Sequence, residues 1–148
     1  MEEIKAEHNE RIRGLELIYK TRGLNSAEIK SFLDGIKLDD YVNASSSVLE
    51  IGCGAGNFLR DIKNIYGAEC CGIDKFPVRA EKNVGIKIME ADAENIPADS
   101  NSFDFIFSYF TFPYIPDKLG ALSEAYRVLK PNGTAIIDFD TLDVDRQD

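Results

Sequence analysis

Residues 48–58 read Val48-Leu49-Glu50-Ile51-Gly52-Cys53-Gly54-Ala55-Gly56-Asn57-Phe58. The opening residues suit a buried strand, and the glycines that follow permit a tight turn and a close approach of the backbone to a ligand. An apolar helical pattern begins at Phe58, and the N-terminus of such a helix would offer free N–H groups and a positive dipole end to an anion. The stretch therefore predicts a strand, a glycine loop and a helix that together form part of a ligand site.

Further strand-like runs follow along the chain at residues 69–73, 85–89, 103–107 and 134–139, and helical segments alternate with them. Repeated β-α units predict an α/β fold, a Rossmann-like doubly wound parallel sheet of about five strands with helices on both faces. The run at 85–89 alternates around Lys87 as an edge strand does, whereas 48–49 and 103–107 are continuously apolar. We therefore expect the first and fourth strands at the centre of the sheet.

Two helices between the strands have apolar residues at helical spacing. The faces expected to pack on the sheet are Phe58, Leu59, Ile62, Ile65 and Tyr66 in the first, and Leu119, Leu122, Tyr126 and Leu129 in the second. The second helix is expected to stop at Pro131-Asn132-Gly133, because proline interrupts a helix and glycine favours its end.

The first part of the chain predicts a helical layer that precedes the sheet. Ile12, Leu15 and Tyr19 recur at helical spacing, and a second helix is expected after Asn25, which can cap it while Glu28 reaches back. A chain of 148 residues with 44% hydrophobic content fits one domain. We expect this single domain over residues 1–148, with the helical layer at 1–46 and a cofactor-binding core at 47–140.

Composition disfavours several kinds of protein. No apolar run has the length of a membrane span, and the N-terminus is acidic where a signal peptide would be basic, so we expect a cytoplasmic protein without a membrane partner. Three cysteines and one histidine, without metal-ligand spacing, support neither a disulfide framework nor a metal site. The net charge of -9 includes an acidic tail that would repel a phosphate backbone, so no nucleic-acid partner is expected unless another subunit supplies positive charge.

Asp74 closes the second strand, 22 residues after Gly52. A carboxylate at this place can accept hydrogen bonds from both ribose hydroxyls of an adenosine ligand, although a helix cap or an ordinary loop acid would also fit the position taken alone. The dinucleotide fingerprint G-x-G-x-x-G would need glycine at position 57, where the sequence has Asn57. A nicotinamide-dependent dehydrogenase is therefore a distant alternative.

Five motifs, in chain order, resemble those of the class I S-adenosylmethionine (SAM)-dependent methyltransferases. They lie at residues 48–56, 72–74, 91–97, 102–106 and 127–133 and read Val-Leu-Glu-Ile-Gly-Cys-Gly-Ala-Gly, Gly-Ile-Asp, Ala-Asp-Ala-Glu-Asn-Ile-Pro, Ser-Phe-Asp-Phe-Ile and Arg-Val-Leu-Lys-Pro-Asn-Gly. The resemblance covers about residues 47–140 and implies SAM as the cofactor.

The same resemblance implies where the parts of the cofactor lie. It places Glu50, Gly52 and Gly54 at the methionine end with Gly56 in the same loop, Asp74 at the ribose, Asp92 at the adenine amino group, the Ala93 backbone at the ring, and Ser108 near the methionine amino group. The residue after the ribose acid is usually apolar in this family, and here it is Lys75. Its aliphatic stem, or neighbouring Phe76, is therefore expected to cover the adenine.

The resemblance favours an enzyme that transfers the methyl group of SAM to a small-molecule acceptor. Transfer from a sulfonium depends largely on alignment and on exclusion of water, so no catalytic residue is predicted. Tyr109, Thr111 and Tyr114 could line an acceptor pocket or could pack as ordinary aromatic core and loop residues. The alternative is a SAM-binding or structural subunit that needs a partner, because family members continue past the fifth strand into a helix and an antiparallel hairpin, whereas this sequence ends at Asp148.

The last strand carries a prediction about association. The run Ala135-Ile136-Ile137-Asp138-Phe139 suits a strand that is covered on both faces and flanked by neighbours. Because the flanking hairpin of the family is missing from the sequence, a second copy or another protein is expected to cover this edge, and a cap formed by the final residues is the alternative.

Overall fold

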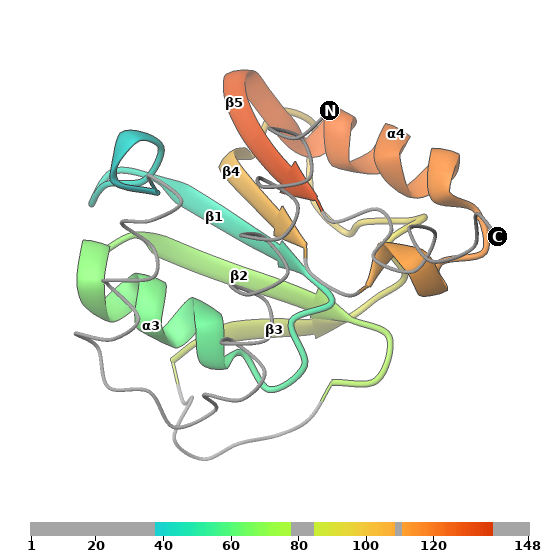
Figure 1. Ribbon diagram of the computed structural model, residues 1–148, viewed down its shortest axis with the longest axis horizontal. Helices are drawn as coiled ribbons and strands as arrows, with labels where there is room; N and C mark the ends of the chain where they lie inside the picture. The colour runs from blue at the N-terminus through green and yellow to red at the C-terminus, as the bar shows by residue number, and fades with distance from the viewer. Residues whose placement is uncertain (1–37, 78–84, 109–110, 138–148) are drawn as a thin grey trace, which may run out of the picture.

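The computed structural model describes residues 38–77, 85–108 and 111–137, and its centre is a five-stranded parallel sheet (Figure 1). The strands are β1 (Ser47–Ile51), β2 (Glu69–Asp74), β3 (Lys87–Glu90), β4 (Phe103–Ser108) and β5 (Leu129–Ile137). The described helices are α3 (Asn57–Tyr66) and α4 (Lys118–Val128), with short 3-10 turns at η1 (Leu38–Asp40) and η3 (Phe112–Tyr114). The two helices expected before residue 37 and the acidic tail lie outside the described residues.

The strand order is β3-β2-β1-β4-β5, and every neighbouring pair is parallel. The predicted arrangement is confirmed, because β3 lies at an edge while β1 and β4 lie inside. The chain builds the sheet outward from β1 to β3 in one direction and then from β4 to β5 in the other, so the order reverses between β1 and β4. In open α/β sheets, ligands bind outside the carboxyl ends of the strands at such a point. Topology alone therefore places a ligand crevice beyond Ile51 and Ser108.

Helix α3 covers one face of the sheet through the apolar residues that its spacing predicted. Phe58, Leu59 and Ile62 are buried, and the Phe58 ring stacks on Phe107 of β4 with 4.2 Å between ring centroids. The helix begins directly after the glycine loop and ends at Gly67, whose N–H bonds to the Lys63 carbonyl. The glycine loop is thus held between a buried strand and a packed helix.

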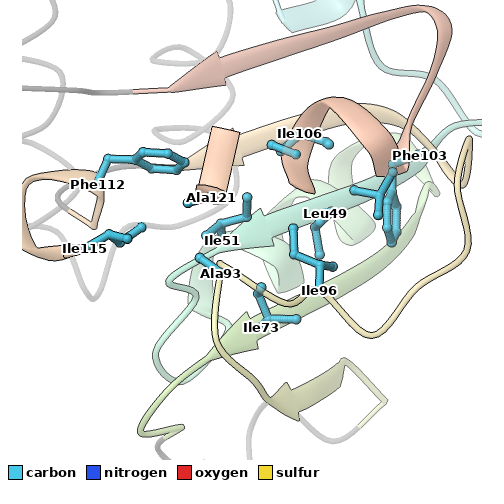
Figure 2. Close-up of a cluster of buried hydrophobic side chains, with 12 residues drawn as sticks. Leu49, Ile51, Ile73, Ala93, Ile96, Phe103, Ile106, Phe112, Ile115 and Ala121 are labelled. Carbon is cyan, nitrogen blue, oxygen red and sulfur yellow. The ribbon is translucent and has the colours of Figure 1, made fainter. Parts of the chain in front are cut away.

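Helix α4 covers the opposite face, and only half of the predicted residues contribute, since Leu122 and Leu129 are partly buried against the core. Ala121, Ala125 and Val128 are buried in a cluster with side chains of β1, β2 and β4 (Figure 2). Leu119 and Tyr126 are instead 79% and 83% exposed. The small alanines let the helix approach a sheet surface that large residues already fill, and the large side chains then point outward.

The stop predicted at Pro131-Asn132-Gly133 was placed too late, since α4 ends at Val128 and β5 begins at Leu129. Asn132 has a positive φ of 64°, and the pairing with β4 shifts register there, from Phe103 opposite Leu129 to Phe105 opposite Thr134. The turn-forming residues therefore produce an irregular start of the strand rather than the end of the helix.

Strand β5 is also less covered than its apolar run predicted. Ala135 is exposed, Ile136 and Ile137 are only half-buried, and the described sheet ends at this strand. A continuous apolar run does not distinguish an interior strand from one at the margin, because both carry apolar residues where they meet the core. Phe139 lies outside the described residues.

Candidate functional site

A pocket of about 280 Å³ opens at the carboxyl ends of β1, β2 and β3. Its floor is Ile51 and Ile73, the last residues of buried strand segments, and its walls are residues 74–76 and 91–93. The turn η3 and the residues after it close the remaining side through Thr111 and residues 114–116. The pocket therefore lies where the strand order predicts a ligand crevice, and most of its lining is apolar.

The three glycines of the loop after β1 differ in what surrounds them. Gly52, Gly54 and Gly56 have φ angles of 79°, 54° and 79°, a region that side chains disfavour. A Cβ at Gly52 would collide with the Thr111 side chain, and one at Gly56 would lie 2.8 Å from Ile88 Cδ1. At Gly54 a Cβ would meet no described atom within 4 Å. Gly52 and Gly56 thus permit packing, whereas no residue that the structure describes crowds the backbone of Gly54.

Asp74 joins the end of β2 to this loop. One carboxylate oxygen accepts a hydrogen bond from the Gly54 N–H at 2.8 Å, and the other accepts from the Phe76 N–H at 2.8 Å. Each oxygen of a carboxylate has a second lone pair, so both can still accept from a ligand. Asp74 thus acts as a loop acid that holds backbone N–H groups, the alternative that the sequence left open. This role is compatible with ligand binding.

Asp92 and Lys75 face one another across the pocket wall. The Asp92 carboxylate accepts from the Glu94 N–H at 3.1 Å, and its other oxygen lies 3.6 Å from the Lys75 ammonium. Their side chains are 43% and 63% exposed, so this ion pair is weak and can open. Ala93 is buried beside them, and Phe76, 79% exposed, also lines the pocket. Four of the residues predicted from the sequence, Asp74, Lys75, Asp92 and Ala93, therefore come together with Gly52.

Glu50 is placed differently, since it is buried beneath the loop and does not line the pocket. Its Oε2 atom has no hydrogen-bond partner among the described residues. Burial, with a smaller contribution from the nearby negative charge of Asp74, raises the pKa of the Glu50 carboxyl from 4.5 to about 8. Such a group favours either protonation or a cation close to it.

The stability of the ligand-free protein is therefore expected to fall as pH rises. Between about pH 4.5 and about pH 8 the folded protein keeps a proton on Glu50 that the unfolded chain has lost, and the free energy of unfolding decreases across this window. Glu50→Gln removes the titrating carboxyl. The decrease in the free energy of unfolding across this pH window should therefore be smaller in the variant by at least about 1 kcal/mol. Thermal unfolding of both proteins at several pH values measures this difference. Parallel stability profiles would show that Glu50 does not carry the effect.

Three further predicted residues, Gly54, Gly56 and Ser108, are not among the residues that line the pocket. Ser108 is fully buried, and its hydroxyl donates to the Ile51 carbonyl at 2.9 Å, which ties β4 to β1. Gly56 lies at the start of α3 against Ile88. Tyr109 lies outside the described residues. The structure thus gives Ser108 and Gly56 packing roles that the sequence pattern did not reveal.

The turn after β4 supplies the lining that the sequence only partly predicted. Thr111 and Tyr114, which could have been core residues, both line the pocket, and Tyr114 is 75% exposed. Ile115 and Pro116 were not predicted. Phe112 is fully buried and anchors the turn, so the residues around it face the pocket. The only signal in the sequence was the pair of prolines, Pro113 and Pro116, which indicate a turn.

The cysteines offer no nucleophile at this site. Cys53 of the glycine loop is buried, and burial raises the pKa of its thiol well above the usual range.

Within residues 38–77, 85–108 and 111–137, no group of three or more His, Cys, Asp or Glu residues is placed to hold a metal ion. Within the same ranges no helix has both the length and the apolar character needed to cross a membrane.

Comparison with known proteins identifies relatives along most of the described chain. A family model for a methyltransferase domain matches residues 49–137. The chain is 35% identical over 99 residues to sterol 4-C-methyltransferase strm-1 of Caenorhabditis elegans, covering 60% of this chain and 29% of that protein. It is 33% identical over 109 residues to "Probable tocopherol O-methyltransferase, chloroplastic" of Oryza sativa subsp. japonica, covering 67% and 30%. It is 34% identical over 107 residues to demethylmenaquinone methyltransferase of Staphylococcus haemolyticus, covering 66% and 45%.

The chain thus spans less than half the length of each of these relatives. Solved structures have the same fold. A SAM-dependent methyltransferase from Thermotoga maritima matches with a TM-score of 0.54 and 33% identity, over 63% of this chain and 44% of its own. A protein from Methanococcus maripaludis described as a SAM-dependent methyltransferase matches with a TM-score of 0.65 and 22% identity, over 84% and 60%, a likeness of fold alone.

Proposed function

The chain belongs to the methyltransferase domain family, the class I SAM-dependent methyltransferases, and from this premise we propose that it binds SAM and transfers the methyl group to a small-molecule acceptor. The observation that carries the proposal is the backbone of Gly54, which no described atom crowds and whose N–H is fixed at 2.8 Å to the Asp74 carboxylate. A glycine loop and a strand-end acid held together at the point where the strand order reverses form a site for an adenosine ligand.

The described residues fit the adenosine part of SAM. We assign Asp74 to the ribose hydroxyls, because both of its oxygens keep acceptor capacity beside the pocket. Asp92 is assigned to the adenine amino group, and the backbone of Ala93 to the ring edge. Phe76 is exposed at the pocket and can cover one face of the adenine, with the Lys75 stem beside it.

The methionine end is assigned to Gly52, Gly54 and Glu50. SAM carries a sulfonium, which activates its methyl group for transfer, and an ammonium. Glu50 is a buried carboxyl with an unpaired oxygen among the described residues, and a nearby cation would stabilise its charged form. Ser108 is assigned a supporting role, because its side chain is fully buried and its hydroxyl donates to the Ile51 carbonyl, which holds β4 on β1. Gly56 supports the loop through its packing on Ile88.

The acceptor is proposed to be a small, largely apolar molecule. The names of the three relatives refer to a sterol, a tocopherol and demethylmenaquinone. In this chain Tyr114, Ile115 and Pro116 give one side of the pocket an apolar surface. No residue is assigned as catalytic, because alignment of the acceptor and exclusion of water account for much of a transfer from a sulfonium.

Transfer itself is tested with SAM that carries a labelled methyl group, offered with a panel of sterols, prenylated quinols and small amines. We expect label in one or more of the apolar acceptors. Binding of SAM without transfer to any acceptor, also after addition of a cell extract that could supply a partner, would reject the enzymatic part of the proposal. Transfer only in the presence of the extract would instead favour the alternative, a SAM-binding subunit that needs a partner.

Association through β5 stays a prediction. Within the described residues this strand pairs with β4 alone, and Ala135 is exposed. We expect a second copy or another protein to cover this edge. Light scattering over a concentration series, together with hydrogen exchange of residues 134–137, tests it. A monomer at every concentration with protected amides would contradict the partner and favour a cap formed by the chain itself.

The cytoplasmic location is likewise only proposed, since one relative named above is chloroplastic.

A further inference from the structure

Arg127 of α4 holds a loop that contributes to the pocket. Its guanidinium donates one hydrogen bond to the Ala98 carbonyl at 2.8 Å and another to the Ile96 carbonyl at 2.9 Å. These carbonyls belong to the irregular segment 91–98, which begins after β3 and includes Asp92 and Ala93. Arg127 does not line the pocket itself, so any effect on a ligand must pass through this segment.

Glu124, one helical turn before Arg127, completes the attachment. Its carboxylate accepts from the Arg127 guanidinium at 2.8 Å through each oxygen, and one oxygen also accepts from the Ile96 N–H at 2.9 Å. The planar guanidinium and the carboxylate match in a bidentate pair, which fixes geometry as well as charge. The pair lowers the pKa of the Glu124 carboxyl, so its charge persists at neutral pH.

The other end of the segment is anchored in a similar way. The Glu94 carboxylate accepts from the Asp117 N–H at the start of α4 at 2.9 Å, while the Glu94 N–H donates to Asp92. Ile96 is 2% exposed and packs in the core beneath α4. Within the segment itself the backbone bonds are Asn95 N–H to Asp92 and Ala98 N–H to Ile96. These internal bonds give the segment its shape, the Ala91 N–H bond to the Asp74 carbonyl at 3.0 Å holds its start on β2, and the contacts with α4 hold its later part.

We propose that Arg127 and Glu124 are positioning residues for base recognition: they hold the segment 91–98 so that Asp92 and Ala93 meet the adenine edge. The proposal rests on the proposed function, since it needs adenine in this part of the pocket. Asp92 is half-exposed, and its contacts within the pocket wall are the weak Lys75 pair and the Glu94 N–H. The Ala91 N–H bond to the Asp74 carbonyl fixes only the start of the segment, so loss of the α4 contacts would let the rest of it, with the Asp92 carboxylate, rotate about that point.

The consequence is a loss of base selectivity when the attachment is removed. Wild-type protein is expected to bind S-adenosylhomocysteine (SAH) at least about tenfold more tightly than its deaminated analogue, in which oxygen replaces the adenine amino group, because two acceptors would then face each other. Arg127→Met keeps the aliphatic stem and removes every donor of the guanidinium. We expect this variant to bind SAH about tenfold more weakly and to discriminate between the two ligands by less than about threefold.

The control is Lys130→Met. Lys130 has a similar exposed fraction, 39% against 35% for Arg127, but its ion pair, at 3.1 Å, is with Asp104 at the amino-terminal end of β4, opposite to the end that bears the pocket. This variant should keep the selectivity ratio of the wild type. Glu124→Gln keeps one acceptor oxygen and should also reduce the selectivity for SAH over its deaminated analogue. This variant replaces Arg127→Met as the test if Arg127→Met does not fold.

Calorimetric titration of the four proteins with both ligands measures the ratio. If Arg127→Met keeps the wild-type ratio of the two dissociation constants, the inference is overturned and the proposed function stays intact. If Arg127→Met does not fold, Glu124→Gln is judged by the same criterion. If the wild type binds both ligands equally, the inference is overturned together with the assignment of Asp92 to the adenine amino group, while binding of SAM itself stands. A wild type that binds neither ligand would reject the proposed function, and the inference with it.

Discussion

Gly54→Val is expected to abolish SAM binding, with affinity reduced at least about a hundredfold. The Cβ of a residue at position 54 would meet no described protein atom within 4 Å, so the protein itself has room for the side chain. The space that valine would fill is the space proposed for the cofactor, and exclusion of the ligand is the reason for the loss. Calorimetry with SAM and SAH measures it.

A matched control separates this effect from backbone strain. Gly54 has a φ of 54°, and a branched residue is strained there whatever its surroundings. Gly67 ends α3 at a φ of 71°, away from the pocket, and an added Cβ would be 3.7 Å from Ala44 Cβ. Gly67→Val should therefore lose stability but keep its affinity for SAM. A folded Gly54→Val protein that binds SAM normally would reduce the glycine loop to a structural element.

Asp74→Ala is expected to weaken SAM binding by roughly tenfold or more, since a hydrogen bond to a charged group is worth about 1.5–3 kcal/mol. The structure adds a second cause. The Gly54 and Phe76 N–H groups would lose their acceptor, so the loop and the pocket wall would be less well ordered. Titration with SAH gives the affinity, and hydrogen exchange at Gly54 reports the order of the loop.

Asp104→Ala is the control for Asp74→Ala. The Asp104 carboxylate also accepts from a backbone N–H, that of Ser47 at 2.8 Å, but at the opposite end of the sheet. Its loss should lower stability without changing the affinity for SAH. If a folded Asp74→Ala protein binds SAH with an unchanged dissociation constant, Asp74 has no place in the site.

The sheet could be predicted from the sequence because its signals are local. Gly52 and Gly67 follow the ends of β1 and α3, and apolar alternation at Lys87 identified the edge strand. The face of α4 could not be predicted in the same way. Leu119 and Tyr126 have helical spacing, but the sheet surface beneath the helix is filled by large side chains from other strands, and alanines fit it better. That competition depends on residues distant in the sequence.

Some of the site residues could likewise be predicted from the sequence, and others depend on contacts between residues distant in the sequence. Asp74 was predicted from its place at a strand end and its distance from Gly52, whereas Asp92 and Ala93 were predicted from the family resemblance, and all three line the pocket. The sequence could not show why positions 52 and 56 must be glycine, because the reason is their close packing on Thr111 and Ile88. Ser108 was placed correctly at a strand end, yet the register with β1 directs its hydroxyl to Ile51. Nothing local indicates that Arg127 holds the segment 91–98.

The central claim is that the pocket at the ends of β1, β2 and β3 is a SAM site, and calorimetric titration of the unmodified protein tests it most directly. We expect saturable binding of SAM and SAH with one ligand per chain and no binding of NAD at the same concentrations. The expected order follows from Asn57, which stands where the dinucleotide fingerprint needs glycine. Binding of NAD in preference to SAM, or no binding of SAM and SAH by the folded protein, would contradict the account.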